Sequence, residues 1–109
     1  MYFLLLFKMI FVHCLADYPL QGDFLSMAKN HKKPIPGVPW YQALGAHSAI
    51  QSGGVWLITG SLLCATLEFI AHALIDYLKC DGKISFNEDQ AAHIVCKVLY
   101  CALIAAGVA

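Results

Sequence analysis

The sequence predicts an all-α protein, and more specifically a four-helix transmembrane bundle. Hydrophobic residues make up 60% of the 109 positions and charged residues only 13%, whereas soluble globular chains carry roughly 25% charged residues. Histidine and aspartate also recur four positions apart, which in an α-helix is one turn. A chain of this length is expected to form one domain.

The first predicted helix covers residues 2–18 and ends before Pro19, which cannot continue it. A secretory signal has a basic start and a cleavage site of small residues. Here Lys8 lies in the middle of the apolar run, and the run carries His13 and Asp17. We therefore expect this segment to be a retained membrane helix.

Residues 19–39 are predicted to form a solvated loop that faces lipid headgroups. They hold all four prolines and the lysines at 29, 32 and 33, and proline breaks helices. A short surface helix around 23–30 fits between the prolines. His31 lies in this loop and is not expected to be a ligand.

Residues 40–79 are almost uncharged, and they must form two helices. One straight helix of this length would run ~60 Å, about twice the hydrocarbon thickness of a bilayer. A break at Thr59-Gly60-Ser61 gives helices at 41–59 and 62–79. The alternative break, at Gly53-Gly54, would leave a first arm too short to cross.

The last helix is predicted at 89–108, after a connection over 80–88 with a turn at Asp81-Gly82. Asn87 or Glu88 is a suitable N-cap, and acidic residues at a helix start complement its dipole.

The lysines predict the orientation of this bundle. Four crossings place the loops 19–39 and 80–88 on one side, and every lysine outside the spans lies in or beside them. The positive-inside rule then places these loops in the cytoplasm and both termini outside. We expect a multi-pass protein of the bacterial inner membrane whose partner is the lipid bilayer. The formal net charge is zero and arginine is absent, which argues against nucleic-acid binding.

Polar residues of all four predicted helices would meet at the cytoplasmic depth of such a bundle. Ionisable groups at membrane depth are functional candidates by default, and imidazoles with carboxylates one turn apart are typical metal ligands of helical bundles. The candidate ligands are His13, Asp17, His47, His72, Asp76, Asp89 and His93.

This ligand set predicts a divalent metal ion, with zinc, manganese or iron all compatible with mixed nitrogen and oxygen ligands. Seven candidates exceed what one tetrahedral ion needs, so either some support the ligands or two ions bind. The alternative is a hydrogen-bonded network that only fixes helix register. Five cysteines without a Cys-x-x-Cys spacing are expected to be reduced.

A second polar layer is predicted deeper in the bundle, formed by Lys8, Glu68 and Lys97. Glu68 precedes Asp76 by eight residues and Lys97 follows Asp89 by eight, which places both ~12 Å deeper. A buried ion pair between Glu68 and Lys97 is the simpler interpretation. The alternative is a proton or ion pathway.

The polar motifs together resemble a domain-of-unknown-function family of small membrane proteins from bacteria and their phages. The motifs are His13-Cys-Leu-Ala-Asp-Tyr-Pro-Leu-Gln21, His47, His72-Ala-Leu-Ile-Asp-Tyr-Leu-Lys79 and Asp89-Gln-Ala-Ala-His93. More remotely, the chain is similar to membrane-bound metal-dependent hydrolases, which implies a divalent metal and hydrolysis. Family members usually carry a second histidine four residues after the one matching His47. Here that residue is Gln51, which argues against a fully occupied two-metal site.

Three functions are compatible with these patterns. The first is a metal-dependent hydrolase acting at the cytoplasmic face on a membrane-associated, lipid-linked substrate, with whichever of Asp17, Asp76 and Asp89 is not a ligand as the general base. The second is a non-enzymatic bundle with a structural metal or a polar network. The third is a proton- or ion-conducting protein. No serine or cysteine nucleophile motif indicates covalent catalysis.

Overall fold

The computed structural model describes residues 2–109, and over this range the chain is all-α. Its helices are α1 (Tyr2–Asp17), α2 (Gly22–Ala28), α3 (Trp40–Thr59), α4 (Leu62–Cys80) and α5 (Phe86–Ala105). The predicted fold class is confirmed at this level, and the short helix expected near residues 23–30 is present as α2.

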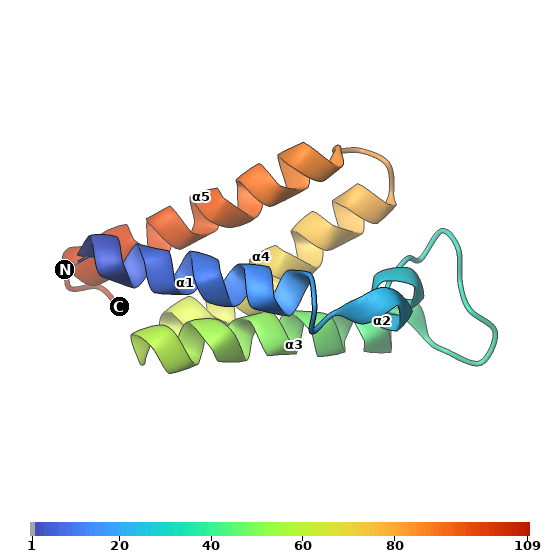
Figure 1. The fold of residues 1–109 in the computed structure, drawn as a ribbon, viewed down its shortest axis with the longest axis horizontal. Helices are drawn as coiled ribbons and strands as arrows, with labels where there is room; N and C mark the ends of the chain where they lie inside the picture. Colours follow the sequence, from blue (N-terminus) through green and yellow to red (C-terminus); the bar gives the residue numbers. More distant parts are fainter. Residues whose placement is uncertain (1) are drawn as a thin grey trace.

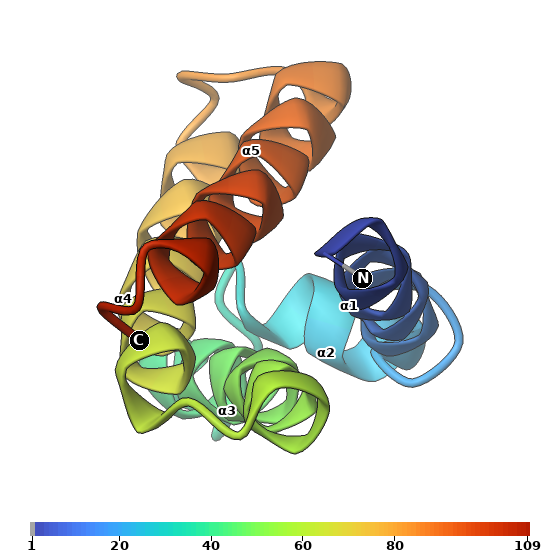
Figure 2. The ribbon, with the colours of Figure 1, turned by 90° about the vertical axis from the view of Figure 1, so that its left-hand side faces the viewer.

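The four long helices form a bundle, and the molecule as a whole, with α2 and the loop that follows it, measures 45 × 23 × 23 Å. They run along its long axis (Figure 1). Helices α1 and α4 each pack against both α3 and α5, so the four form a closed ring in the end-on view (Figure 2). We call the end with both termini and the α3–α4 turn the terminal end. The other end, with α2 and the α4–α5 turn, is the loop end.

The break between α3 and α4 lies at the predicted turn. Gly60 ends α3 in the left-handed conformation, with φ of 68°, which suits a residue without a Cβ. Ser61 then caps α4, its side chain accepting a hydrogen bond from the backbone N–H of Cys64 at 3.1 Å. The rival break at Gly53-Gly54 is instead continuous helix inside α3.

Gly54 sets how closely α1 approaches α3. A Cβ built at this position would lie 2.5 Å from Cγ1 of Val12, whereas one at Gly53 would meet nothing within 4 Å. Gly54 therefore lets α1 lie against the α3 backbone, which brings the polar residues of these two helices together.

Helix α5 begins three residues earlier than predicted and ends earlier as well. Its N-cap is Ser85, which forms a capping box with Glu88, so neither Asn87 nor Glu88 is the cap. The box satisfies two exposed N–H groups at once. At the other end, Gly107 has φ of 76°, which ends the helix before the predicted residue 108.

The segment after α2 is less solvated than predicted. Lys29 is only 5% exposed, and its ammonium group lies 2.9 Å from Oδ2 of Asp76. His31 stacks on the ring of Tyr77 and contacts Asp81 at 3.0 Å. The hydrogen bonds from His31 and Lys32 hold the pKa of Asp81 below its ordinary value. These contacts fasten the loop to the end of α4.

The bundle interior has an apolar half and a polar half. At the terminal end, a small apolar cluster contains Met9, Val55, Cys64, Tyr100 and Cys101. Toward the loop end, most of the large buried side chains are polar, and they include histidines, carboxylates and lysines. Among the largest fully buried side chains, all but Met9 and Cys64 are polar, while Phe3 and Leu57 are 83% and 77% exposed.

Over residues 2–109, none of the helices alone has both the length and the apolar composition required to cross a membrane. The pair α1 and α2, bent by 84° between them, passes the same test when taken together.

Candidate metal centre

The predicted His/Asp residues meet in the polar half of the bundle. Helix α1 supplies His13 and Asp17, α3 supplies His47, α4 supplies His72 and Asp76, and α5 supplies Asp89 and His93, all at most 9% exposed. The spacing of four residues along α1, α4 and α5 places both residues of each pair on one face of its helix.

Asp17, His47 and His72 form a first group of possible metal ligands. Nε2 of His47 lies 3.0 Å from Oδ1 of Asp17 and 3.1 Å from Nε2 of His72. His72 Nε2 lies 3.9 Å from the same Asp17 oxygen. Three different helices therefore direct one nitrogen or oxygen atom each at a common point.

His72, Asp76 and His93 form a second group. Oδ2 of Asp76 lies 3.3 Å from His72 Nε2, and its Oδ1 lies 3.1 Å from His93 Nε2. The rings of His72 and His93 stack with their centroids 4.0 Å apart. Because both groups use Nε2 of His72, which binds one ion at a time, they describe one shared centre.

The tautomer of His72 is set by Glu68. Nδ1 of His72 lies 3.1 Å from Oε2 of Glu68, and since a carboxylate only accepts, Nδ1 carries the proton and Nε2 presents a lone pair to the centre. Lys97 and Tyr100 also donate to Glu68, at 2.7 and 2.9 Å. The predicted ion pair of Glu68 and Lys97 is confirmed, and it supports His72.

His13 and Asp89 lie beside the centre and outside both groups. His13 Nε2 is 3.1 Å from Oε1 of Gln90. Gln90 donates to Oδ2 of Asp17 at 2.7 Å and to Oδ2 of Asp89 at 3.2 Å. Oδ1 of Asp89 is buried without a hydrogen-bond partner, 3.4 Å from His93 Nε2.

Two predicted polar positions do not join the centre. Lys8 is exposed on the bundle surface next to Ile58, so its assignment to the deep layer is wrong. In α1 it is Met9 that is buried in the core, and Lys8 therefore lies on the outward face of this helix. Gln51 is buried but donates to the backbone oxygen of His13 at 3.4 Å, and so joins α3 to α1.

Sequence reasoning missed two residues of the centre, Lys29 and Gln90. The sequence places Lys29 among the lysines of a solvated loop, whereas α2 carries it back over the bundle to Asp76. Gln90 lies inside the Asp89-Gln-Ala-Ala-His93 motif and was a visible candidate. Both contacts join residues more than 45 positions apart, so no helical spacing reveals them.

The buried charges of this region do not balance. Four buried carboxylates, those of Asp17, Glu68, Asp76 and Asp89, face two buried ammonium groups, those of Lys29 and Lys97. With neutral histidines, two negative charges remain, and uncompensated charge is costly to bury. One divalent cation would neutralise them.

The distances within the centre also fit a metal ion. Zinc bonds of about 2.0–2.2 Å at tetrahedral angles separate the ligand atoms by roughly 3.3 Å. The three separations within the first group are 3.0, 3.1 and 3.9 Å, and His72 lies 3.3 Å from Asp76 of the second group, so the observed values lie on both sides of this one. Buried His/Asp groups of this chain can therefore hold a metal ion.

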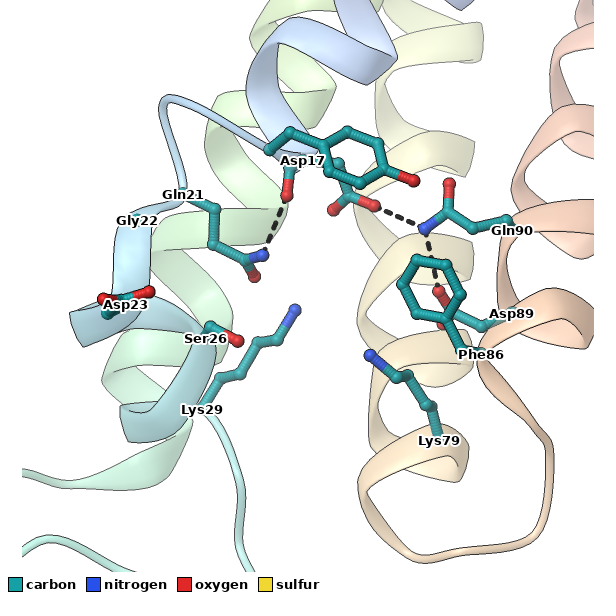
Figure 3. Close-up of a pocket in the computed structure, with 11 residues that line it drawn as sticks. Asp17, Gln21, Gly22, Asp23, Ser26, Lys29, Lys79, Phe86, Asp89 and Gln90 are labelled. Carbon is teal, nitrogen blue, oxygen red and sulfur yellow. Dashed lines mark hydrogen bonds between the residues drawn. The ribbon is translucent and has the colours of Figure 1, made fainter.

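A pocket of about 270 Å³ connects the centre to the loop end. Figure 3 shows it between α2, the end of α1, and the facing ends of α4 and α5. Asp17, Asp89 and Gln90 line it together with Lys29 and Lys79, and in this view Asp17 and Gln90 lie above the two lysines. Of the residues in the two ligand groups, Asp17 alone is among those that line this pocket.

Fold and site together define a small helical bundle with a buried His/Asp centre that opens into a polar pocket. The chain belongs to a family described as proteins of unknown function (DUF3307), whose model matches residues 5–108. No curated protein and no solved structure matches it.

Proposed function

We propose that this protein is a membrane-embedded hydrolase that uses one divalent metal ion, with its active site near the loop end of the bundle. A membrane location is supported by the reversed distribution of its side chains. Large hydrophobic side chains cover the outside while most large buried ones are polar, opposite to the usual pattern of soluble proteins. The 45 Å length is close to the ~40–45 Å of a bilayer with headgroups.

The metal would be held by His72 together with Asp17 and His47, with Asp76 and His93 closing the opposite side. A divalent ion at this position supplies Lewis acidity and lowers the pKa of a water molecule bound to it. Glu68 fixes His72 in the tautomer that can act as a ligand. Lys29 and Gln90 hold the carboxylates of Asp76 and Asp17 in place.

Asp89 is the best placed general base of the three aspartates. Asp17 and Asp76 each belong to one of the two ligand groups, and Gln90 and Lys29 also contact their carboxylates. Asp89 keeps its Oδ1 without a hydrogen-bond partner while its side chain lines the pocket. A proton taken from water in the pocket would go to the Asp89 carboxylate.

The observation that carries the enzymatic proposal is the pocket at the centre. A structural metal site is normally closed by protein ligands, whereas a catalytic site keeps an open side for water or substrate. Here Asp17 and Asp89 belong both to the His/Asp cluster and to the pocket wall. Ion conduction through Glu68 is less favoured, because this carboxylate contacts His72, Lys97 and Tyr100 at once.

The test is metal analysis of the protein purified in detergent without a histidine tag. We expect about one equivalent of zinc, manganese or iron, released in acid as the histidines protonate. His72→Ala should lose most of the metal. His31→Ala, which lies in the loop, should keep it. Folded wild-type protein that holds no metal and cannot be reloaded would refute the proposal.

A second measurement separates catalysis from metal binding. Asp89→Asn should retain the metal and lose hydrolysis of ester substrates, because Asp89 lies outside both ligand groups. Loss of metal from this variant would instead make Asp89 a ligand.

A further inference from the structure

The pocket beside the centre is lined by two lysines, and metal binding alone does not require cations there. We propose that it binds the phosphate group of the substrate, so that the reaction is hydrolysis of a phosphoester. This inference rests on the proposed hydrolase function and adds the substrate class. Its cationic residues are Lys29 and Lys79, and Gln21 and Ser26 are neutral polar groups that also line the pocket.

The two ammonium groups face the pocket from different elements. Lys29 comes from the end of α2 and Lys79 from the last turn of α4, and both point inward in Figure 3. Lys29 is engaged with Asp76 at 2.9 Å. Lys79 makes no ion pair with any residue of 2–109, and its Nζ lies 4.9 Å from the centre of the Phe86 ring. Lys79 is therefore available to pair with an anion.

The position of Lys79 relates it to the metal centre. It lies three residues after Asp76, so both project from one face of α4. A tetrahedral phosphate in the pocket could accept a hydrogen bond from the ammonium group of Lys79 through one oxygen. Another of its oxygens could point past Asp17 and Asp89 toward the metal centre. Charge-assisted hydrogen bonds from lysine to phosphate are strong.

A phosphate explains this arrangement better than a carboxylic ester or an amide. Those substrates are neutral until one oxygen becomes charged in the transition state, and a metal alone can stabilise that charge. A phosphoester carries charge from the start, spread over several oxygens, and needs cations on more than one side. The overall hydrolysis consumes one water, breaks one P–O bond, and yields an alcohol and a phosphate.

The carboxylates that line the pocket make phosphate binding depend on the metal. Without an ion, Asp17 and Asp89 would repel an anion in the pocket, and Asp23, which also lines it, adds to this repulsion. One divalent cation cancels the two uncompensated charges of the buried region, and the ammonium group of Lys79 then offsets the charge of Asp23 and is placed to attract the anion. Phosphate and metal should consequently bind cooperatively, each raising the affinity for the other.

The first experiment measures binding of inorganic phosphate to the detergent-purified, metal-loaded protein by calorimetry. Lys79→Met should keep its metal and bind phosphate about tenfold more weakly, as expected for loss of one charged hydrogen bond. Lys83→Met is the matched control, since the side chain of Lys83 is 65% exposed and pairs with Asp81 outside the pocket. It should bind phosphate as the wild type does.

The outcomes separate this inference from the proposed function. Equal phosphate affinity in wild type and Lys79→Met, or binding that survives metal removal, would overturn the phosphate site even if the protein binds metal. Hydrolysis of p-nitrophenyl acetate, without hydrolysis of p-nitrophenyl phosphate or its diester, would also overturn the phosphate site. It would still support the proposed hydrolase function. Vesicles containing phosphatidate, compared with the soluble phosphoesters, show whether the phosphate belongs to a lipid headgroup.

Discussion

At the scale of single residues, the deep polar layer is part of the support of the metal centre. The sequence predicts Glu68 as the partner of Lys97, with a proton or ion pathway as the alternative, and the 2.7 Å contact confirms the pair. The same carboxylate receives the N–H of His72. A carboxylate behind a ligating histidine fixes its ring and raises its basicity. If the centre binds a metal as proposed, Glu68 has two functions, one in stability and one in metal affinity.

These two functions can be separated by a double-mutant cycle. Glu68→Gln strands the buried ammonium group of Lys97, which should lower the free energy of unfolding by about 3–5 kcal/mol. Adding Lys97→Met should restore much of this stability. It should not restore metal affinity, which we expect to stay about 10–100-fold weaker. Denaturant unfolding and metal titration measure the two effects, and additive losses in stability would show that the residues are not partners.

At the scale of the helices, the contact of α1 with α3 depends on one glycine. Gly54→Ala would place a methyl group 2.5 Å from Val12 Cγ1, and the β-branched valine has little freedom to move away in a helix. We expect a loss of about 1–3 kcal/mol in unfolding free energy. The shift of α1 should also weaken metal binding through Asp17.

Gly53→Ala is the matched control for this substitution. A Cβ there meets nothing within 4 Å, and alanine is the better helix former by about 0.5–1 kcal/mol. It should therefore leave stability unchanged or raise it. Replacing Val12 by alanine in the Gly54→Ala background should recover much of the loss. If Gly53→Ala and Gly54→Ala behave alike in thermal unfolding, the close approach is not important.

The helices themselves were predictable because their signals are local. The Gly60-Ser61 break, the proline-rich segment and the periodic polar residues each act within a few positions of the chain. The start of α5 differs from the prediction of residue 89. Ser85 caps the helix through its capping box with Glu88, so the helix begins at Phe86, three residues earlier. A Ser-x-x-Glu sequence is visible in the chain, and the box rule alone would have placed this start.

At the scale of the whole molecule, the orientation in the membrane remains a proposal that labelling can test. In a cysteine-free variant, Lys83→Cys reports on the loop end and Val108→Cys on the terminal end. Both positions are well exposed, at 65% for the Lys83 side chain and 63% for Val108. A membrane-impermeant maleimide added to intact cells should label Val108→Cys and spare Lys83→Cys, because lysine-bearing loops stay in the cytoplasm.

The reverse labelling pattern would invert the orientation. Equal labelling of both positions only after cell lysis would contradict a membrane-spanning bundle, since both ends would then lie in the cytoplasm. Lysis of the cells before labelling provides the positive control, in which both cysteines should react.

The sequence by itself determined the helical class, the break at residues 59–61 and most of the residues that surround the centre. These features follow from the period of the helix and from backbone preferences, which act over short distances. Only the tertiary structure decided that Lys29 reaches Asp76, that Glu68 supports His72, and that Lys8 stays outside. Each of these depends on how helices distant in the chain rotate and pack against one another. The spacing of residues along a helix shows which of them share a face of that helix. The packing of the helices decides which residues of the other helices that face contacts.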